Sequence, residues 1–185
     1  LSQMSANDFY IKHIRAKFNP ECLIIGYDFS FGRQREGDVI FLNELARKEN
    51  IELDVIASID WMGESVSSTR IRRALLLGDV ELARQMLGRN YYKEGVVVFG
   101  QQQAKLLGYP TANIIPENIN LKNGVYCTET QVEEVRFKSI TNVGVKPTFN
   151  LNQKVIETHL LDQNLNLYGK KIKVHFQKFI REEIQ

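Results

Sequence analysis

The sequence is poor in cysteine, in net charge and in long apolar runs. Cys22 and Cys127 are the only cysteines among 185 residues, which is too few for a disulfide scaffold. Each lies in an apolar run, so we expect buried free thiols and, with them, a reducing compartment and a cytoplasmic location. No stretch approaches the roughly 20 apolar residues of a transmembrane helix, and the N-terminus has no basic-then-apolar signal segment. We therefore expect no membrane partner.

The charge balance argues against a nucleic-acid partner. The chain has 24 Lys+Arg and 22 Asp+Glu, for a net charge of +2, whereas nucleic-acid-binding domains carry a basic patch or stripe. This small excess suits an anionic small molecule held by a few local cations. Hydrophobic residues make up 43% and charged residues 25%, which is the composition of a globular protein.

The chain up to about residue 90 alternates between helical and strand patterns. Helices and strands are predicted in turn over 5–18, 22–26, 38–49 and 53–57. Two short helices follow, with Ser68 and Asp79 as N-caps and with Gly78 and Gly88 as C-terminal stops. This alternation is typical of an α/β domain with parallel strand pairing.

From Tyr91 onward the pattern becomes that of β-strands. Strands are predicted near 95–99, 124–128, 136–143, 155–161 and 171–176. In the last of them the apolar residues should face one side and the polar ones the other: Ile172, Val174 and Phe176 against Lys171, Lys173 and His175. Several short strands at close spacing suggest a small antiparallel barrel. We therefore divide the chain into domains 1–90 and 91–185.

A glycine-containing loop leads into the most specific motif of the chain. Gly100 and Gly108 can bring backbone N–H groups close to phosphate oxygens, and Lys105 adds a positive charge for the same anion. Thr111 and Asn113 share one face of an extended segment, and their oxygens suit Mg²⁺ that bridges nucleotide phosphates. From the spacing alone, an ordinary hairpin loop with local turn hydrogen bonds is the more frequent outcome.

The segment from Gly100 to Asn113 resembles the signature of riboflavin kinases, in which a glycine-containing loop precedes Pro-Thr-Ala-Asn. The resemblance implies that Thr111 and Asn113 bind Mg²⁺ and the ATP phosphates. Ala104-Lys105 stands where many members have Gly-Arg, so the charge is kept but the bidentate guanidinium is lost.

A second block, from Val155 to Leu160, resembles the strand that carries the catalytic glutamate of riboflavin kinases. The resemblance implies that Glu157 is the general base that takes the proton of a ribityl hydroxyl. Without the resemblance, an exposed strand carboxylate is the commoner outcome for a glutamate. His159 shares the face of Glu157 by alternation and is expected to have a supporting role.

Two further motifs lie in the α/β part. Asp28 and Phe29 follow a strand, where open α/β sheets bind ligands, and they can hydrogen-bond to a planar ring and stack on it. Ser68, Thr69 and Arg72 lie at a helix start, where N–H groups, hydroxyls and a guanidinium can bind phosphate. The alternatives are a loop with buried aromatic residues and an ordinary N-cap followed by solvated arginines.

Both motifs resemble blocks of the adenylyltransferase module of bifunctional riboflavin kinase/FAD synthetases. The resemblance implies that Asp28 and Phe29 lie in the flavin/nucleotide cleft, and that Ser68, Thr69 and Arg72 contact the ATP phosphates. That family carries a His-x-Gly-His motif near its N-terminus, and this sequence has none. We therefore expect the adenylyltransferase step to be inactive in this chain, and the kinase domain to lack its C-terminal helical segment.

The patterns predict an α/β part followed by an all-β part. The resemblance implies that these are a truncated Rossmann-like nucleotidyltransferase domain and a small Greek-key β-barrel of the riboflavin kinase type. The expected activities are ATP- and Mg²⁺-dependent phosphorylation of riboflavin to FMN and, in a longer parent protein, adenylylation of FMN to FAD. Riboflavin, FMN and ATP are the expected partners. The alternative is a non-catalytic flavin- or nucleotide-binding module. A nucleic-acid-binding barrel is weaker, since it needs aromatic residues alternating with basic ones.

Overall fold

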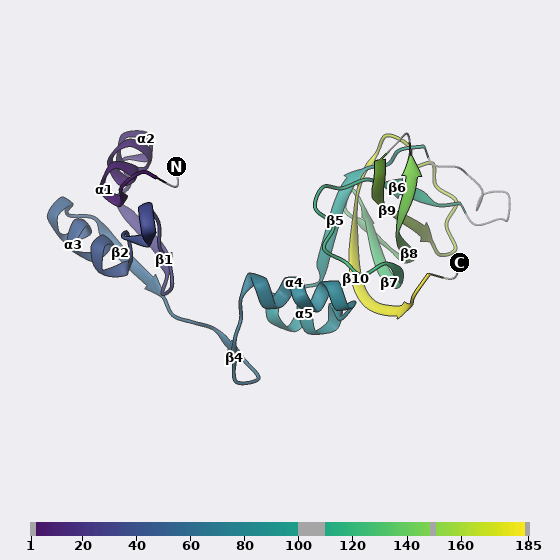
Figure 1. Ribbon diagram of the computed structural model, residues 1–185. Helices are drawn as coiled ribbons and strands as arrows, with labels where there is room; N and C mark the ends of the chain where they lie inside the picture. Colours follow the sequence, from purple (N-terminus) through teal and green to yellow (C-terminus); the bar gives the residue numbers. More distant parts are fainter. Residues whose placement is uncertain (1–2, 100–109, 149–150, 184–185) are drawn as a thin grey trace. The chain divides into compact units, whose positions relative to one another are not determined.

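The chain divides into two compact units, Leu1–Ser65 and Val66–Gln185. The computed structural model describes residues 3–99, 110–148 and 151–183 (Figure 1). Two helices that follow Ser65 pack with the β-strands beyond them. The compact units therefore divide ahead of these helices, whereas the sequence pattern changes behind them, near residue 90.

A helical segment opens the first unit, as predicted for residues 5–18. It is made of α1 (Ala6–Phe9), a π-helical stretch (Tyr10–Arg15) and α2 (Ala16–Phe18). The Ser5 hydroxyl accepts a hydrogen bond from the backbone N–H of Asp8 at 3.1 Å and caps the first turn. Asn19 ends the segment in the left-handed conformation, with a φ of 41°.

Two parallel strands form the sheet of the first unit. β1 (Cys22–Gly26) pairs in register with β2 (Glu52–Ile56), and α3 (Val39–Glu49) lies between them in the sequence. The predicted helix and the predicted parallel pairing are confirmed. Asp38 caps α3 by accepting a hydrogen bond from the N–H of Phe41 at 2.9 Å. Short elements complete the unit: a 3₁₀ turn (Arg33–Arg35) and the hairpin of β3 (Asp60–Trp61) and β4 (Glu64–Ser65).

Both cysteines are free, but both are exposed, so the prediction that they are buried is wrong. Cys22 is the first residue of β1, whose side chains are in part exposed. Cys127 lies in the barrel between the buried Tyr126 and Thr128 and therefore faces outward. Successive side chains of an apolar run point to opposite faces of the strand, and both cysteines lie on a face that is exposed to solvent.

A pair of short helices begins the second unit. They are α4 (Ser68–Leu77) and α5 (Val80–Leu87). Gly78 and Gly88 end them in the left-handed conformation, and Asp79 caps α5 through the N–H of Leu82 at 2.9 Å, as predicted. The cap of α4 is Ser67 and not Ser68, so that prediction is wrong by one residue. Either serine has the hydroxyl that a cap needs, and it is the Ser67 hydroxyl that accepts the hydrogen bond from the N–H of Arg70 at 3.2 Å.

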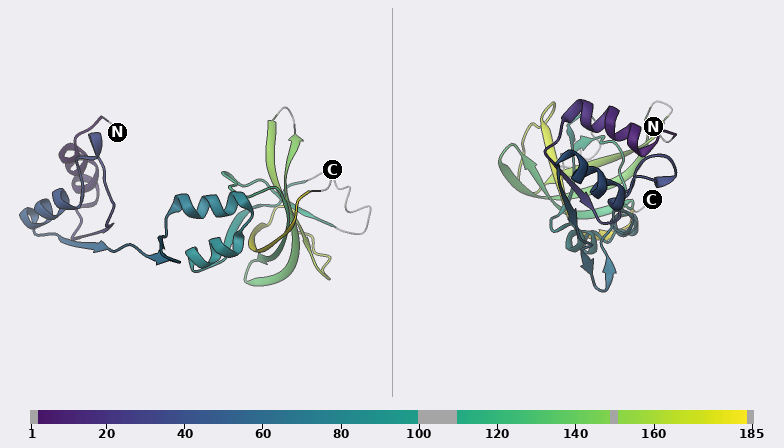
Figure 2. Two further views of the ribbon diagram at one scale, coloured as in Figure 1. Left: turned by 60° about the horizontal axis from the view of Figure 1, so that its bottom comes forward. Right: turned by 90° about the vertical axis from the view of Figure 1, so that its left-hand side faces the viewer.

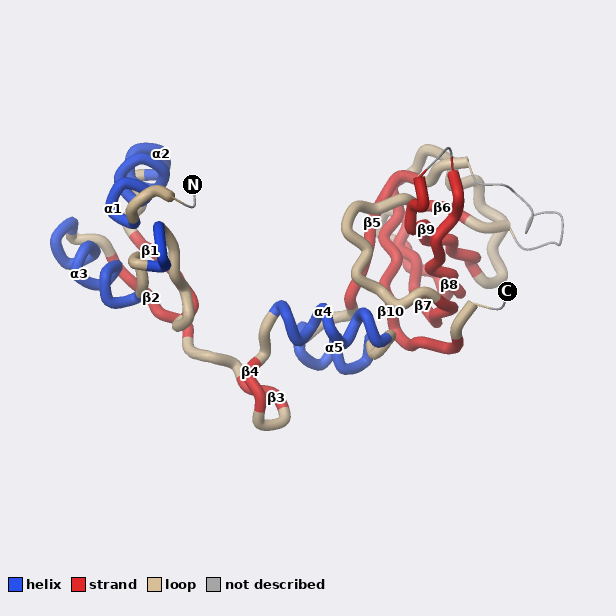
Figure 3. The backbone as a smooth tube through the Cα atoms, viewed as in Figure 1, coloured by secondary structure: helices blue, strands red, loops and turns tan. Residues whose placement is uncertain are grey.

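A six-stranded antiparallel sheet curls into a nearly closed barrel (Figures 2 and 3). Its strands are β5 (Tyr91–Val96), β6 (Ala112–Ile114), β7 (Gly124–Val132), β8 (Val135–Thr148), β9 (Leu151–Leu160) and β10 (Lys171–Arg181). Their order is β5-β10-β7-β8-β9-β6. β10 returns beside β7 after the β7-β8-β9 meander, which is the order of a Greek key. A bridge between Val98 and Asn113 brings the two edges together.

The barrel core continues into the helical pair. Ile172, Val174 and Phe176 of β10 are buried, as their alternation predicts. Lys173 is on the other face, whereas His175, also predicted to face outward, is covered by its neighbours and only 9% exposed. α4 and α5 add several apolar side chains to the same core: Ala74, Leu75, Val80, Ala83 and Met86. This shared core explains why the helices belong to the barrel unit.

A network of buried hydroxyl groups crosses the barrel interior. It joins Thr128, Thr130, Ser139, Thr141 and Thr158 through contacts of 2.7 to 3.0 Å between side-chain oxygens. Because each hydroxyl has partners, the cost of burying it is offset. None of the described helices is long and apolar enough to cross a membrane.

Candidate active site

Three polar residues lie side by side across three neighbouring strands of the barrel. Asn113 on β6 is in register with Glu157 on β9, and Glu157 is in register with Asn142 on β8. Residues directly opposite one another in a sheet share a face and have Cβ atoms roughly 5 Å apart. We call Asn113, Glu157 and Asn142 the polar row. Asn113 is 7% exposed, and the other two are half-buried.

The chain that enters β6 is held by the strand that carries Glu157. The ring Nδ1 of His159 lies 2.9 Å from the carbonyl oxygen of Pro110. Asn113 directs its Nδ2 toward the carbonyl oxygen of Thr111 at 3.5 Å. The His159 contact ties the segment just ahead of Thr111 to β9, and strand pairing ties Asn113 to the same strand. Thr111 and Asn113 are therefore close to Glu157 in the fold.

A cavity of about 330 Å³ opens beside Thr111. We call it the barrel cavity, and it is lined by Val97, Pro110, Thr111, Ala112, Thr158, Leu160 and residues 163–168. Its size falls in the range of small-molecule sites. At its margin the rings of Tyr168 and Phe99 are stacked, with centroids 4.2 Å apart and an interplanar angle of 18°. The cavity thus combines hydroxyl groups, apolar walls and an aromatic face.

The last described residues of the chain reach the other end of the polar row. Glu183 accepts a hydrogen bond from Asn142 Nδ2 at 2.8 Å. Lys154 of β9 donates a hydrogen bond to the carbonyl oxygen of Leu121. Burial lowers the pKa of Lys154, and the negative charge of Glu183 opposes that shift. Glu183 is therefore an acidic neighbour of β8 and of β9, the strand that carries Glu157.

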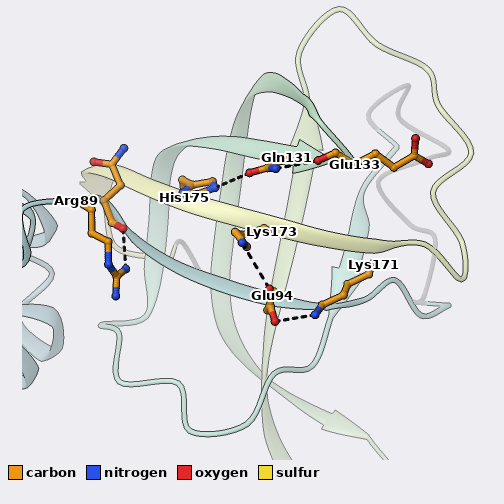
Figure 4. A network of polar contacts seen from close by, with 8 residues as sticks. Arg89, Glu94, Gln131, Glu133, Lys171, Lys173 and His175 are labelled. Atoms are coloured by element: carbon orange, nitrogen blue, oxygen red, sulfur yellow. Dashed lines mark hydrogen bonds and ion pairs between the residues drawn. The ribbon is translucent and has the colours of Figure 1, made fainter. Parts of the chain in front are cut away.

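A separate polar cluster covers the outer face of β5, β10 and β7 (Figure 4). Glu94 forms ion pairs with Lys171 at 2.8 Å and with Lys173 at 3.8 Å. The hydrogen bond from Lys171 lowers the pKa of Glu94. His175 Nε2 lies 3.4 Å from Gln131 Oε1. Since the carboxylate and the lysines already pair with one another, we assign this cluster to strand cohesion and not to ligand binding.

Asp28 and Phe29 line a hollow of about 420 Å³ in the first unit. Arg35 lines it too and donates a hydrogen bond to the Ser30 hydroxyl at 2.6 Å. The Phe29 N–H donates to the Gly26 carbonyl at 3.0 Å, which turns the chain directly after β1. The motif predicted to follow a strand therefore does so, and it lines a concave surface.

Ser68, Thr69 and Arg72 lie in the first turns of α4, within the second compact unit. Arg72 donates a hydrogen bond to the Ser68 hydroxyl at 3.2 Å. The structure thus groups these three residues together, and it groups Asp28 with Phe29 in the first unit. The three remaining candidates, Gly100, Lys105 and Gly108, lie outside the described residues.

Sequence reasoning missed two members of this site. Asn142 lies in the strand predicted near 136–143 without a role of its own, and Glu183 is one of two adjacent glutamates that follow Arg181 without a recognisable motif. Only the register of β8 on β9 brings Asn142 beside Glu157. A one-residue slip in that register would turn Asn142 to the other face, and the sequence alone does not fix it.

Two protein-family models match this chain, and they divide it between them. The model described as riboflavin kinase matches residues 87–185, and the model described as FAD synthetase matches residues 1–70. The first match covers more than half of the chain and includes the whole barrel. The chain therefore belongs to the riboflavin kinase family.

Similar proteins carry both regions in one polypeptide. A bifunctional riboflavin kinase/FMN adenylyltransferase of Buchnera aphidicola subsp. Schizaphis graminum is 40% identical over 187 residues, which cover 98% of this chain and 60% of that protein. The protein of the same name in Escherichia coli strain K12 is 33% identical over 184 residues, with coverages of 98% and 58%. The chain spans about three-fifths of the length of these curated relatives.

A solved structure has the same fold. The structure of a macrolide-efflux protein from Streptococcus pneumoniae matches this chain with a TM-score of 0.80 and 26% sequence identity. The match covers 100% of this chain and 60% of that one. The family models carry the assignment to a family, and this match supports the fold.

Proposed function

We propose that the barrel unit transfers the γ-phosphoryl group of ATP to riboflavin and forms FMN. The observation that carries the proposal is the register of Asn113 beside Glu157. Thr111 precedes Asn113 by two residues and lines the barrel cavity. Phosphoryl transfer needs an acceptor for the proton of the attacking hydroxyl and oxygen ligands that position the phosphates. This arrangement offers both.

Glu157 acts as the general base in this proposal. The terminal ribityl hydroxyl attacks the γ-phosphorus, a new P–O bond forms, and the bond between the γ-phosphorus and the β–γ bridging oxygen breaks. ADP leaves, and Glu157 takes the hydroxyl proton. Glu157 is half-buried on β9 and lies in register between Asn113 on β6 and Asn142 on β8.

Thr111 and Asn113 are the residues proposed to hold Mg²⁺ and the ATP phosphates. A threonine hydroxyl and an amide oxygen are the hard oxygen ligands that Mg²⁺ prefers, so the donor set fits. Asn113 directs Nδ2 to the Thr111 carbonyl, which leaves Oδ1 as its ligand atom. When bound, Mg²⁺ neutralises phosphate charge. Asn113 is held on β6, and Thr111 is held on the segment whose Pro110 carbonyl contacts His159. Gly100, Lys105 and Gly108 are proposed to contribute to the same phosphate site.

For the first unit, we propose a role in adenylylation of FMN to FAD within a longer protein. The parallel β1-β2 pair with α3 is consistent with a Rossmann-like nucleotidyltransferase domain. Asp28 and Phe29 are the proposed flavin/nucleotide contacts, because they line a hollow just after β1. Ser68, Thr69 and Arg72 belong to the second unit, and they are proposed as phosphate contacts because they gather at the start of α4.

The test is to incubate the chain with riboflavin, ATP and Mg²⁺ and to separate the flavins by chromatography. FMN without FAD is the expected result. FAD would show that the chain needs no His-x-Gly-His motif for the second step. If neither product forms although riboflavin binds, as read from quenching of its fluorescence, the chain is a flavin-binding module and not a kinase.

A further inference from the structure

The side-chain oxygen of Asn142 is a buried hydrogen-bond acceptor. Asn142 Oδ1 has no hydrogen-bond partner among the residues that the structure describes, whereas Nδ2 of the same amide donates to Glu183. Buried polar atoms in folded proteins almost always have a partner, and an exception marks a place where a water, an ion or a ligand group is missing. An oxygen acceptor calls for a group that donates, such as a hydroxyl.

Asn142 is placed to meet the same molecule as Glu157. The two residues face each other in register on β8 and β9, so their side chains share one face of the sheet at a spacing of roughly 5 Å between Cβ atoms. A carboxylate and an amide oxygen at that spacing are two hydrogen-bond acceptors side by side. They match two hydroxyl groups on adjacent carbon atoms better than one isolated hydroxyl.

Glu183 determines which atom of the amide is presented. By accepting the hydrogen bond from Nδ2, its carboxylate leaves Oδ1 as the remaining acceptor. The strand makes room for this carboxylate at Gly144, where a Cβ atom would collide with the Glu183 side chain. The glycine at position 144 therefore leaves space for the end of the Glu183 side chain beside Asn142.

We propose that Asn142 is a substrate-positioning residue that accepts a hydrogen bond from the hydroxyl next to the one that is phosphorylated. The inference rests on the proposed function, since it takes Glu157 as the base and riboflavin as the acceptor. It adds a source of selectivity, because a flavin whose side chain lacks the adjacent hydroxyl would leave Asn142 Oδ1 unpaired.

The first test combines a variant with an altered substrate. Asn142→Ala is expected to raise the KM for riboflavin about tenfold, the effect of one hydrogen bond, and to leave the KM for ATP unchanged. 4′-Deoxyriboflavin, which lacks the adjacent hydroxyl, should be a poorer substrate for the unmodified chain and should suffer no further loss in the variant. Asn43→Ala in α3 serves as the control and should change neither constant. An equal loss on both flavins, or an equal rise in both KM values, would overturn the proposal.

The second test works through Glu183, whose side chain is exposed, so that its substitution spares the core. Glu183→Ala should raise the KM for riboflavin, whereas Glu183→Gln keeps an acceptor for Nδ2 and should restore most of the affinity. Equal behaviour of the two variants would overturn the role of Glu183. If the unmodified chain forms no FMN, the proposed function fails by itself. Riboflavin fluorescence then decides the inference: weaker binding by Asn142→Ala supports it, and unchanged binding overturns it.

Discussion

Asn113 on β6 and Glu157 on β9 are direct neighbours in antiparallel register. The pair is held from both sides, because Val98 bridges to Asn113 and β8 pairs with β9. The proposed proton acceptor is thereby held next to a proposed phosphate ligand before any substrate arrives. Such preorganisation is the main contribution a protein makes to phosphoryl transfer.

Replacing Glu157 by glutamine should abolish the kinase reaction and leave the fold intact. Gln keeps the shape of the side chain but cannot take the hydroxyl proton, so we expect FMN formation to fall by about 100-fold or more. Rates of FMN formation by chromatography and the thermal midpoint of unfolding are the measurements. Glu129→Gln on β7, whose carboxylate lies 3.7 Å from Arg136, is the matched control. Unchanged turnover in Glu157→Gln would show that Glu157 is not the general base.

Removing the Thr111 hydroxyl should weaken the binding of ATP and leave the binding of riboflavin unchanged. Thr111→Val keeps the volume of the side chain on the cavity wall but loses one oxygen ligand. The KM for ATP at fixed Mg²⁺ should rise about tenfold or more, with little change in the KM for riboflavin. Thr111→Ser retains the hydroxyl and should stay close to the unmodified chain. An unchanged KM for ATP in Thr111→Val would remove the hydroxyl from the phosphate site.

His159 should act through position and not through chemistry. Its ring Nδ1 lies 2.9 Å from the Pro110 carbonyl, just ahead of Thr111. His159→Ala removes that contact, so we expect a loss of about 1 kcal/mol in unfolding free energy and a higher KM for ATP. His159→Asn places an amide nitrogen near the position of Nδ1 and should recover part of both. Urea unfolding and initial rates report the two effects separately, and a normal KM for ATP in His159→Ala would exclude the anchoring role.

The sequence was sufficient for the local elements but not for the assembled site. Helix caps such as Asp38 and Asp79, and the buried face of β10, follow from short-range rules that involve neighbouring residues. The burial of Cys127 was misjudged because an apolar run does not say which face of a strand is covered. Asn142 and Glu183 were missed because strand register and the path of the chain after β10 are long-range properties.

The hydroxyl network should contribute measurably to stability. Thr141 Oγ1 lies 2.7 Å from Thr128 Oγ1 and 2.9 Å from Thr158 Oγ1, and all three residues are buried. Thr141→Val leaves two buried hydroxyls short of a partner, so we expect a loss of about 1–3 kcal/mol in unfolding free energy. Urea titration followed by circular dichroism measures it. Thr141→Ser keeps the hydroxyl and should lose less, and a neutral Thr141→Val would mean that the network re-pairs without it.

His175 should make the barrel less stable as the pH falls. Burial, and then the positive charges of Arg136 and Lys173, lower its pKa from the ordinary value of 6.5. Between the ordinary and the lowered pKa the unfolded chain binds the proton and the folded chain does not, so stability is present above about pH 6.5 and is lost as the pH falls toward the folded-state value. Other charges face the ring as well: Arg89 opposes protonation and Glu129 favours it.

Urea unfolding at pH 7 and at pH 5 checks this dependence on His175. His175→Gln removes the titrating ring, so its loss of unfolding free energy between the two pH values should be smaller than that of the unmodified chain. His13→Gln, in the helical segment of the first unit, is the control and should leave the barrel transition unchanged. An identical pH dependence in His175→Gln and the unmodified chain would assign the acid sensitivity of the barrel to its carboxylates instead.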